Sequence, residues 1–377
     1  MKKIKFCKLC VEPNTRPNSI FNKEGICFSC QQMTKKSKTN YKRRAKELGA
    51  ICRWAKKNAS SNFDCIIPVS GGKDSTRQAL FMRDNFGMKP LLVSCTYPPE
   101  QQTQIGAENM ANLIENGFDA ICISPAPITW KKLTKYCFIN FGNIFKSSEL
   151  ALYASAPKIA LSYKIPLLVY GENPALQWGG DTHMSKDGNA IRQKYNNTLQ
   201  GGNLDIYLNH GFKLNKLFWY DYPSDRELIK SKIKSIYLGY YIDNFDDDYN
   251  SKFSIQNGLK IREGFDADPI NTGSLTPYDA LDDNFVFVNQ MIKYFKFGFG
   301  KSTQQLSGFI RKGLFSRNEA IELVRKFDGN CSNKYIKSFC KYIGISEKKF
   351  WEIANKFRNK NIWRFSNGQW NMKVKLK

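Results

Sequence analysis

Short apolar runs alternate with longer amphipathic segments over the first two thirds of the chain. The runs are rich in β-branched residues and bounded by turn residues, as buried parallel strands are. They predict strands over 65–69, 90–96, 120–124 and 166–170. The segments between them have helical spacing and predict helices over 75–86, 103–116 and 149–163. This alternation predicts an α/β fold with a doubly wound parallel sheet and right-handed crossovers.

The pattern changes after about residue 224. The segment SDRELIKSKIKSIYL opens with Ser224 and has Glu227 three residues later, which predicts a helix that starts with a capping box. NFDDDYN (244–250) predicts an acidic loop, and residues 279–365 predict mostly helices. We therefore divide the chain into four parts: a cysteine module, a basic helical connector, the α/β domain and a helical C-terminal region, over 1–33, 34–60, 61–245 and 246–377.

The composition is that of a globular protein with a strong positive charge. Hydrophobic residues make up 42% of the 377 residues, enough for a sizeable core. Lys and Arg number 58 against 33 Asp and Glu, giving +25. Such an excess favours anionic partners such as nucleotides, sugar nucleotides, RNA or an acidic protein. A lysine-rich chain with no such partner would show the same excess, because the lysines are spread along the whole sequence.

Two features bear on location. No apolar run reaches the roughly 18–20 residues that a membrane-spanning helix needs. The N-terminal MKKIKFCKLC is basic and leads into cysteines, without the apolar stretch of a secretory signal. We expect a cytoplasmic protein with no membrane span.

The clearest chemical motif joins the first predicted strand to the first predicted helix. Two glycines let the backbone turn tightly and approach phosphate oxygens, and the free N–H groups of the helix start face the anion. Serine hydroxyls can add donors and lysine a cation, whereas aspartate fits only if it holds Mg²⁺ between phosphate oxygens. The motif consists of Ser70, Gly71, Gly72, Lys73, Asp74 and Ser75.

This motif differs from the Walker pattern and resembles the SGGxDS loop of the ATP pyrophosphatase (PP-loop) superfamily. The resemblance implies that the loop grips the pyrophosphate of ATP, so that the α–β bond breaks and AMP passes to an acceptor. It assigns Lys73 and Asp74 to catalysis and Asp74 to Mg²⁺. It also implies an adenine nucleotide alpha hydrolase-like fold.

The superfamily resemblance adds two further sites at the carboxyl ends of strands, where ligands of such sheets bind. The adenine is expected against Ser94 and Thr96 at the end of the second strand. Gly171 and Glu172 follow the fourth strand, and Glu172 either binds Mg²⁺ or the acceptor or stabilises the turn. His183, in a loop near the strand ends, is a candidate substrate contact, whereas His210 is read as structural.

Four of the eleven cysteines form two CxxC pairs, which suit a tetrahedral zinc site that holds a small module together. An iron–sulfur cluster is the alternative, and four thiolates leave no open position for catalysis. The predicted zinc ligands are Cys7, Cys10, Cys27 and Cys30.

Four segments together resemble the N-acetyl sugar amidotransferase family: CKLCVEPNTRP, GICFSC, SGGKDS and YFKFGFGKSTQQLSGFIRKGLFSRNEAIELVRKFDG. The resemblance is strongest to members that act in pseudaminic acid modification. It implies ATP-dependent conversion of the acetamido group of a bacterial nonulosonic or related sugar to acetamidino, for surface glycans or flagellin. GENPALQWGGD replaces the acidic, glycine-rich stretch expected after the fourth strand. The resemblance therefore does not identify the sugar or its carrier.

Ammonia is the second substrate that this family resemblance implies. No Cys–His–Glu set that could hydrolyse glutamine stands out. The family obtains ammonia from separate glutaminase and cyclase-like subunits, and we predict a docking face for them at the aromatic residues 295–299. Nearby cations are candidates to face an anionic sugar or nucleotide: Lys296, Lys301, Arg311, Lys312 and Arg317.

Two alternatives remain open from the sequence. A tRNA thiolase would share the PP-loop, the zinc knuckles and the charge, but such enzymes often carry a further cysteine pair, and no third CxxC is present. A non-catalytic zinc-ribbon protein that binds nucleic acid would explain the charge but not SGGKDS. Nucleic acid is therefore not the expected partner.

Overall fold

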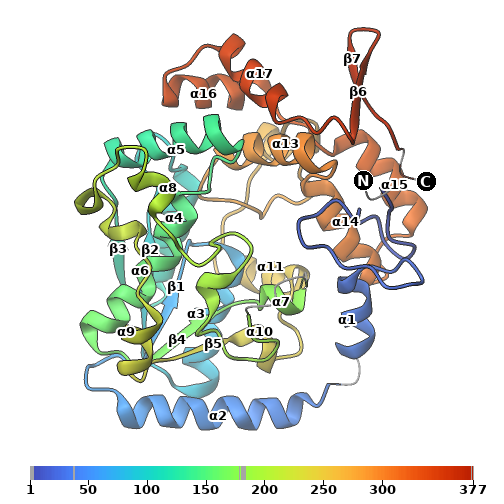
Figure 1. Cartoon of the computed structure of the whole chain (residues 1–377). Helices are drawn as coiled ribbons and strands as arrows, with labels where there is room; N and C mark the ends of the chain where they lie inside the picture. The colour runs from blue at the N-terminus through green and yellow to red at the C-terminus, as the bar shows by residue number, and fades with distance from the viewer. Residues whose placement is uncertain (1–3, 37–38, 178, 180–183, 375, 377) are drawn as a thin grey trace.

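The computed structural model describes residues 4–36, 39–177, 179, 184–374 and 376. Its centre is a five-stranded parallel sheet in the order β3-β2-β1-β4-β5 (Figure 1). The predicted α/β class is confirmed, and all four predicted strands are present. The strands are β1 (Cys65–Pro68), β2 (Pro90–Cys95), β3 (Asp119–Ile123), β4 (Leu167–Tyr170) and β5 (Lys234–Tyr237).

The fifth strand was not predicted. Ser224 and Glu227 do form the capping box of α9 (Asp225–Lys230), but that helix ends within two turns. Lys232 then adopts φ +59°, a left-handed conformation that ends a helix. The following segment pairs with β4, which buries Ile236 and Tyr237 on opposite faces of the sheet. Burial in the tertiary structure thus makes a strand of residues whose sequence predicts the end of a helix.

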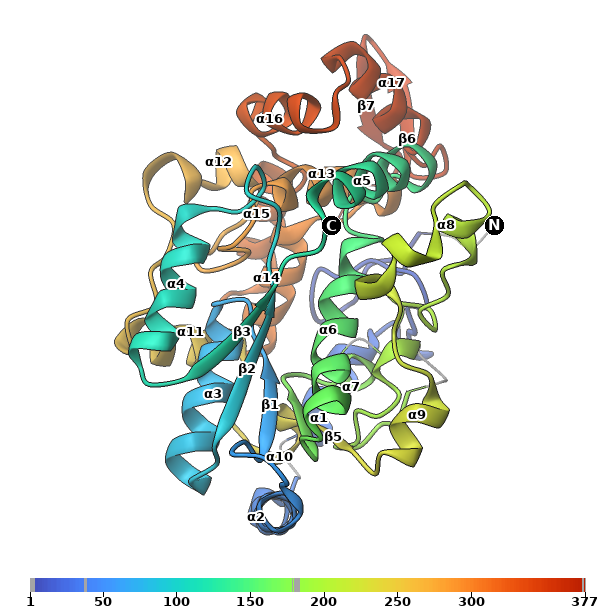
Figure 2. The same cartoon turned by 90° about the vertical axis from the view of Figure 1, so that its left-hand side faces the viewer.

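Both faces of the sheet are covered, so its strands are apolar on both sides (Figures 1 and 2). On one face, Ile67 packs in a core with residues of α2 (Tyr41–Asn58), α3 (Lys73–Phe86) and α4 (Gln104–Glu115). On the other face, Ile66 packs against α6 (Ser148–Tyr163). The basic connector therefore contains a helix, α2, whose inner face belongs to the sheet core.

The C-terminal helices form a separate core that is joined to the α/β domain through α5 (Pro127–Phe141). Phe138 of α5 stacks on Phe350 with ring centroids 5.2 Å apart. This core is built by α13 (Phe285–Phe297), α16 (Asn333–Ile343) and α17 (Glu347–Lys356). Between α13 and α16 in the chain are α14 (Lys301–Arg311) and α15 (Arg317–Phe327), which pack in a different core. A hairpin of β6 (Trp363–Ser366) and β7 (Gln369–Met372) follows α17.

The segment 244–250 was predicted to be an acidic loop, but its second half is helical. Asp246 caps α11 (Asp247–Gln256) by accepting the N–H groups of Asp248 and Tyr249. Carboxylates at a helix N-terminus are favoured by its unpaired N–H groups and dipole. Because α11 packs along α3, the acidic start of α11 lies beside the N-terminal end of α3, where the SGGKDS motif is.

The cysteine module lies against α14 and α15, at the side of the molecule away from β3 (Figure 1). Val11 packs there with Leu306 and Ile321. Among the helices that the structure describes, none combines the length and apolarity of a membrane span. The remaining short elements are α1 (Phe28–Lys36), α7 (Pro174–Gln177), η1 (Gln193–Tyr195), α8 (Asp205–Leu208), η2 (Leu214–Lys216), η3 (Phe218–Tyr220), α10 (Leu238–Tyr241), η4 (Gly264–Asp266) and α12 (Pro269–Thr272).

Candidate functional site

The SGGKDS loop lies where the strand order of the sheet reverses. Strands β2 and β3 are added on one side of β1, and β4 and β5 on the other, so the loops that follow β1 and β4 diverge. Such a switch point is the usual ligand site of an open α/β sheet. Gly71 has φ +73°, and a Cβ on it would lie 3.1 Å from the backbone nitrogen of Met110. Gly72 is the N-cap of α3, so the loop has the tight turn and the helix N-terminus that the motif predicts.

Lys73 is buried at the start of α3 and is surrounded by carboxylates. Its Nζ lies 2.9 Å from Asp74 Oδ2, 3.1 Å from Asp247 Oδ1 and 3.5 Å from Asp279 Oδ1. Burial alone would lower the pKa of Lys73, but these carboxylates raise it well above its usual value. The lysine is therefore a permanent cation at the SGGKDS loop.

Three carboxylates meet beside this lysine: Asp74, Glu172 and Asp247. One carboxylate oxygen from each lies within 4.8 Å of the other two. Mg²⁺ binds oxygens at about 2.1 Å, so ligands around one ion are about 3–4 Å apart, and a small rearrangement would fit this set. Burial, followed by the charges of Asp74 and Asp247, raises the pKa of Glu172 to about 8. A divalent cation would relieve this repulsion.

Further side chains orient this cluster. Asn250 Nδ2 donates to Asp74 Oδ1 at 2.8 Å. Asp279 Oδ2 accepts from Thr276 Oγ1 at 2.6 Å and from Gln305 Nε2 at 2.7 Å. Burial opposes ionisation of Asp279, but Lys301 and Lys73 hold its pKa well below the usual range. Asp279 is thus held in place as an ionised partner of Lys73.

The other predicted nucleotide residues lie at the same sheet edge, with protein partners. Ser75 Oγ donates to Gly72 O at 3.1 Å. Ser94 is buried in β2, and Thr96 Oγ1 lies 2.6 Å from Ser124 Oγ. A Cβ on Gly171 would lie 2.8 Å from Gln78 Nε2, so this glycine already has a packing reason. Ser70 is exposed at the loop.

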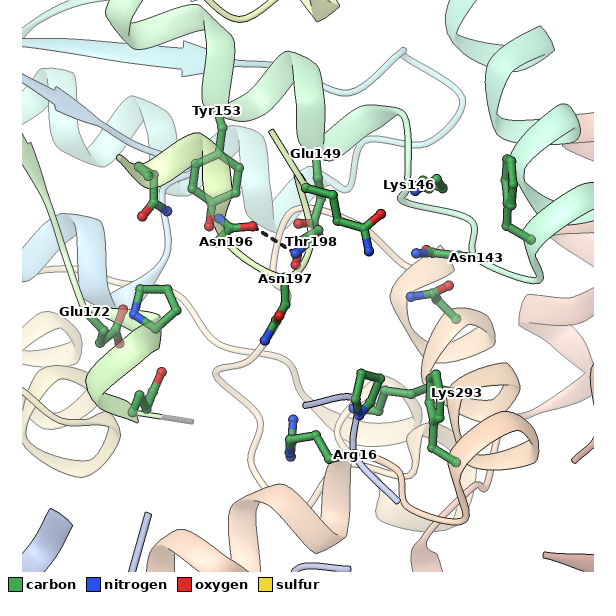
Figure 3. A pocket seen from close by; sticks show the side chains of 18 of the residues that line it. Arg16, Asn143, Lys146, Glu149, Tyr153, Glu172, Asn196, Asn197, Thr198 and Lys293 are labelled. Atoms are coloured by element: carbon green, nitrogen blue, oxygen red, sulfur yellow. Dashed lines mark hydrogen bonds between the residues drawn. The ribbon is translucent and has the colours of Figure 1, made fainter. Parts of the chain in front are cut away.

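A cavity of about 740 Å³ opens at Glu172, a size typical of small-molecule sites. Figure 3 shows Glu149 and Tyr153 on one side, Arg16 and Lys293 opposite, and Glu172 at one end. Burial raises the pKa of Glu149 to about 7. Burial, with the charges of Arg16 and Lys301, lowers the pKa of Lys293 to about 7. The remaining lining is mostly polar and includes Asn143, Lys146, Gln193, Asn196, Asn197, Thr198 and Asn289.

The predicted docking face at residues 295–299 is wrong. Phe295 and Phe299 are buried, and the Phe295 carbonyl accepts Trp363 Nε1 at 2.9 Å. Phe297 and Phe299 line the cavity. Phe295 belongs to the C-terminal core, and Phe297 and Phe299 face the cavity, so these aromatics do not form an exposed surface.

The five predicted tail cations have different positions. Lys296 lines the cavity, while its Nζ donates to Phe141 O at 2.7 Å. Lys301 lies 3.2 Å from Asp279 Oδ2. Arg311 and Lys312 line a second cavity of about 560 Å³, which also reaches Glu172 and Asp247. Arg317 Nε donates to Cys10 O at 3.2 Å, so it supports the cysteine module.

The four cysteines of the module are buried and close together, as predicted. Cys7 Sγ lies 3.9 Å from Cys30 Sγ, and Cys10 Sγ lies 3.7 Å from Cys27 Sγ. A zinc ion with Zn–S bonds of about 2.3 Å places its sulfurs roughly 3.8 Å apart. Cys7 Sγ also accepts the N–H groups of Leu9 at 3.4 Å and Cys27 at 3.3 Å, as a thiolate would. The set could hold a zinc ion.

The remaining thiols and the histidines offer no activated nucleophile among the described residues. Burial is the main reason why the pKa of each of the seven other cysteines is raised. The pKa is raised to about 12 in Cys52, Cys95 and Cys331 and to about 11 in Cys340. His210 is exposed, and its Nδ1 lies 3.0 Å from Ile206 O. His183, the candidate substrate contact, lies outside the described residues.

Sequence reasoning missed several residues that the fold brings to the site. Asp247 could have been found from the acidic run 244–250, but that run predicts only a loop. Asp279 and Glu149 have ordinary surroundings in the sequence, and Lys293 was hidden in an aromatic segment. Arg16 lies next to the cysteine motif and was read only as part of it.

One family and one curated protein match parts of the chain. Residues 273–377 match a family described as LPS biosynthesis protein WbpG-like, C-terminal domain. This segment carries Asp279, Lys293 and Lys301. The chain is also 34% identical over 89 residues to the uncharacterized protein MJ1599 of Methanocaldococcus jannaschii, a match that covers 23% of this chain and 31% of that protein. The chain thus spans about a third of this relative.

Proposed function

We propose that this protein is an ATP-dependent, AMP-forming amidotransferase that converts an acetamido group of a bacterial nonulosonic or related sugar to acetamidino. The observation that carries the proposal is one continuous site. The phosphate loop, the three carboxylates and the polar cavity meet at Glu172. A cavity of about 740 Å³ suits a sugar, and the segment similar to a lipopolysaccharide biosynthesis family supplies part of its wall.

The chemistry proceeds in two displacement steps. ATP binds with its phosphates at residues 70–75, against the N-terminus of α3. The acetamido oxygen attacks the α-phosphorus, the α–β bond breaks, and pyrophosphate leaves. Ammonia then attacks the carbon of the O-adenylyl imidate, AMP departs with the former acetamido oxygen, and the acetamidine remains. The protein contributes positioning and charge neutralisation, and no side chain becomes covalently attached.

Each part of the site has a role in this scheme. Lys73 and the N–H groups of the α3 N-terminus neutralise phosphate charge. Asp74, with Glu172 and Asp247, would hold Mg²⁺, which supplies further charge neutralisation when bound. Glu149 and Tyr153 face the cavity, where they can orient hydroxyl or acetamido groups of the sugar (Figure 3).

The supply of ammonia is proposed to come from a separate glutaminase. Hydrolysis of glutamine needs an activated thiolate or its equivalent. Burial raises the pKa of the seven cysteines outside the module, which disfavours the thiolate in all of them. The same property weakens the thiolase alternative, since sulfur transfer also needs a reactive thiolate.

The test is turnover of the purified chain with ATP, Mg²⁺, ammonium at raised pH and a panel of N-acetylated sugars, followed by phosphorus NMR. We expect AMP and pyrophosphate in equal amounts, together with an acetamidino product in the mass spectrum. Formation of ADP and phosphate would refute α–β cleavage. Glutamine in place of ammonium should give no product, and efficient use of glutamine by the isolated chain would refute the separate ammonia supply.

A further inference from the structure

The cysteine module reaches the cavity of about 740 Å³ with its own residues. Arg16 and Pro17, which follow the first CxxC pair in the chain, line that cavity together with residues of β4, α6 and α13. In Figure 3 the Arg16 side chain lies beside Lys293, across the cavity from Glu149 and Tyr153. The module thereby contributes a guanidinium to the cavity wall.

Arg16 is held in place by the metal-binding loop itself. Its Nε donates to Glu12 Oε1, and Glu12 is buried. The Glu12 carbonyl in turn accepts the N–H of Cys7 at 2.8 Å. The guanidinium also lies over the Phe299 ring, 4.5 Å from its centroid. The position of Arg16 therefore depends on the fold of the loop that the cysteines close.

The module is also bonded to other walls of the cavity. Thr15 Oγ1 donates to Phe297 O, and Asn18 Nδ2 donates to Asn197 Oδ1 at 2.6 Å. Ser29 Oγ donates to Gln177 O at 2.7 Å. Phe297, Asn197 and Gln177 all line the cavity. Three separate segments of the wall thus touch the module, whereas the motif at residues 70–75 has none of these contacts.

We propose that Arg16 binds the acceptor sugar through an anionic oxygen group, so that an intact four-cysteine site is required for acceptor binding but not for nucleotide binding. This inference rests on the proposed function, because it takes the cavity as the acceptor site. Arg16 is a cation at one wall of the cavity, and its planar guanidinium suits either a carboxylate or a phosphate. The group is therefore either a sugar carboxylate or the phosphate of a sugar nucleotide.

The experiment is equilibrium binding to the full chain by calorimetry, which does not depend on turnover. Two probes separate the two sources of the anion: N-acetylneuraminate carries a carboxylate, and UDP-N-acetylglucosamine carries phosphates. The variants are Arg16→Ala and Arg16→Lys, with Arg43→Ala as the matched control, since Arg43 is an exposed arginine on α2. ATP with Mg²⁺ is titrated in parallel.

We expect Arg16→Ala to lower the affinity for the probe that binds by about tenfold or more. Arg16→Lys should lower this affinity less, because lysine keeps the positive charge, although it lacks the paired N–H donors of the guanidinium. Binding of ATP and the zinc content should not change. Arg43→Ala should bind both ligands as the unmodified chain does. Asn18→Ala, which removes one contact of the module with the cavity wall, should lower the affinity for the probe by a smaller factor.

Removal of the metal with a chelator tests the second half of the proposal. The metal-depleted chain should lose probe binding and keep ATP binding. The inference is overturned if neither probe binds the unmodified chain, if Arg16→Ala binds the probe normally, or if metal depletion leaves probe binding intact. Equal loss of probe and ATP binding would also overturn it. Probe binding that depends on Arg16, in a chain that forms no AMP with any sugar, would sustain the inference while refuting the proposed function.

Discussion

The SGGKDS loop and the sugar-sized cavity are adjacent, but they are built in opposite ways. Six consecutive residues, 70–75, form the loop and the first turn of α3, whereas the cavity takes its lining from the cysteine module, β4, α5, α6, the segment 193–200 and α13. A contiguous site depends on local backbone geometry, and an assembled one depends on the packing of distant segments. The comparison teaches that changes in the two regions should have separable effects on nucleotide and acceptor.

The largest expected effect is in the contiguous loop. Asp74→Asn removes one of the three carboxylates beside Lys73 and should lower pyrophosphate formation by about 10²-fold or more, because charge neutralisation at the phosphates is lost. The fold should remain intact, because Asp247 and Asp279 still face Lys73 and asparagine can still accept the hydrogen bond from Asn250. Asp84→Asn, at the exposed end of the same helix, is the control. Normal ATP turnover by Asp74→Asn would show that the loop is not the phosphate site.

The next prediction concerns the assembled region. Purified protein should carry about one zinc per chain, and Cys27→Ser should lose most of it, because a structural site with three thiolates binds far more weakly. Hydrogen exchange should speed up over residues 4–36 and stay unchanged in β1 and β2. Cys122→Ser, which alters an exposed thiol on β3, is the control. Iron with a visible absorption band, in place of zinc, would favour the thiolase alternative.

Glu172 belongs to both regions and should link Mg²⁺ binding to pH. Burial raises its pKa to about 8, so a proton competes with the cation below that pH. Mg²⁺ affinity should rise by roughly up to tenfold per pH unit between pH 6 and 7.5 and level off above about 8. In the metal-free protein, the stability should fall as the pH rises from about 4.5 through about 8, since the folded state holds the proton more tightly.

Calorimetric titration of Mg²⁺ and thermal unfolding at several pH values measure both effects. Glu172→Gln cannot ionise and should flatten both curves over this range. Asp248→Asn alters a neighbouring carboxylate outside the cluster of three and should leave the slopes as they are. A Mg²⁺ affinity independent of pH in the unmodified chain would remove Glu172 from the proposed cation site.

A smaller effect is expected from Gly71→Ala, which separates crowding from backbone strain. At φ +73° an alanine costs about 1–2 kcal/mol, and its Cβ would also press on Met110 at 3.1 Å. ATP affinity should fall by about tenfold, because the loop must move. Gly117→Ala is the matched control, because it has φ +88° and open space around its Cβ. It should lower the stability similarly without changing ATP binding.

The contacts among distant residues explain why the cavity was not found in the sequence. Arg16, Glu149 and Lys293 come from three segments whose proximity depends on how the module, α6 and α13 pack. The docking face at residues 295–299 failed for the same reason. An aromatic run is compatible with an interface or a core, and only the burial of Phe295 among the C-terminal helices shows that it belongs to a core.

The sequence by itself determined four strands of the parallel sheet, the loop at residues 70–75 and the two cysteine pairs. Each of these features is encoded by residues close together in the chain. The strands follow from short apolar runs, the loop from the conformational freedom of two glycines, and the cysteine pairs from the spacing of metal ligands. Only the tertiary structure decided the fifth strand, the positions of Asp247 and Asp279 around Lys73, and the sugar-sized cavity. The reason is physical: these features are stabilised by burial and charge interactions between segments far apart in the chain, which local periodicity does not record.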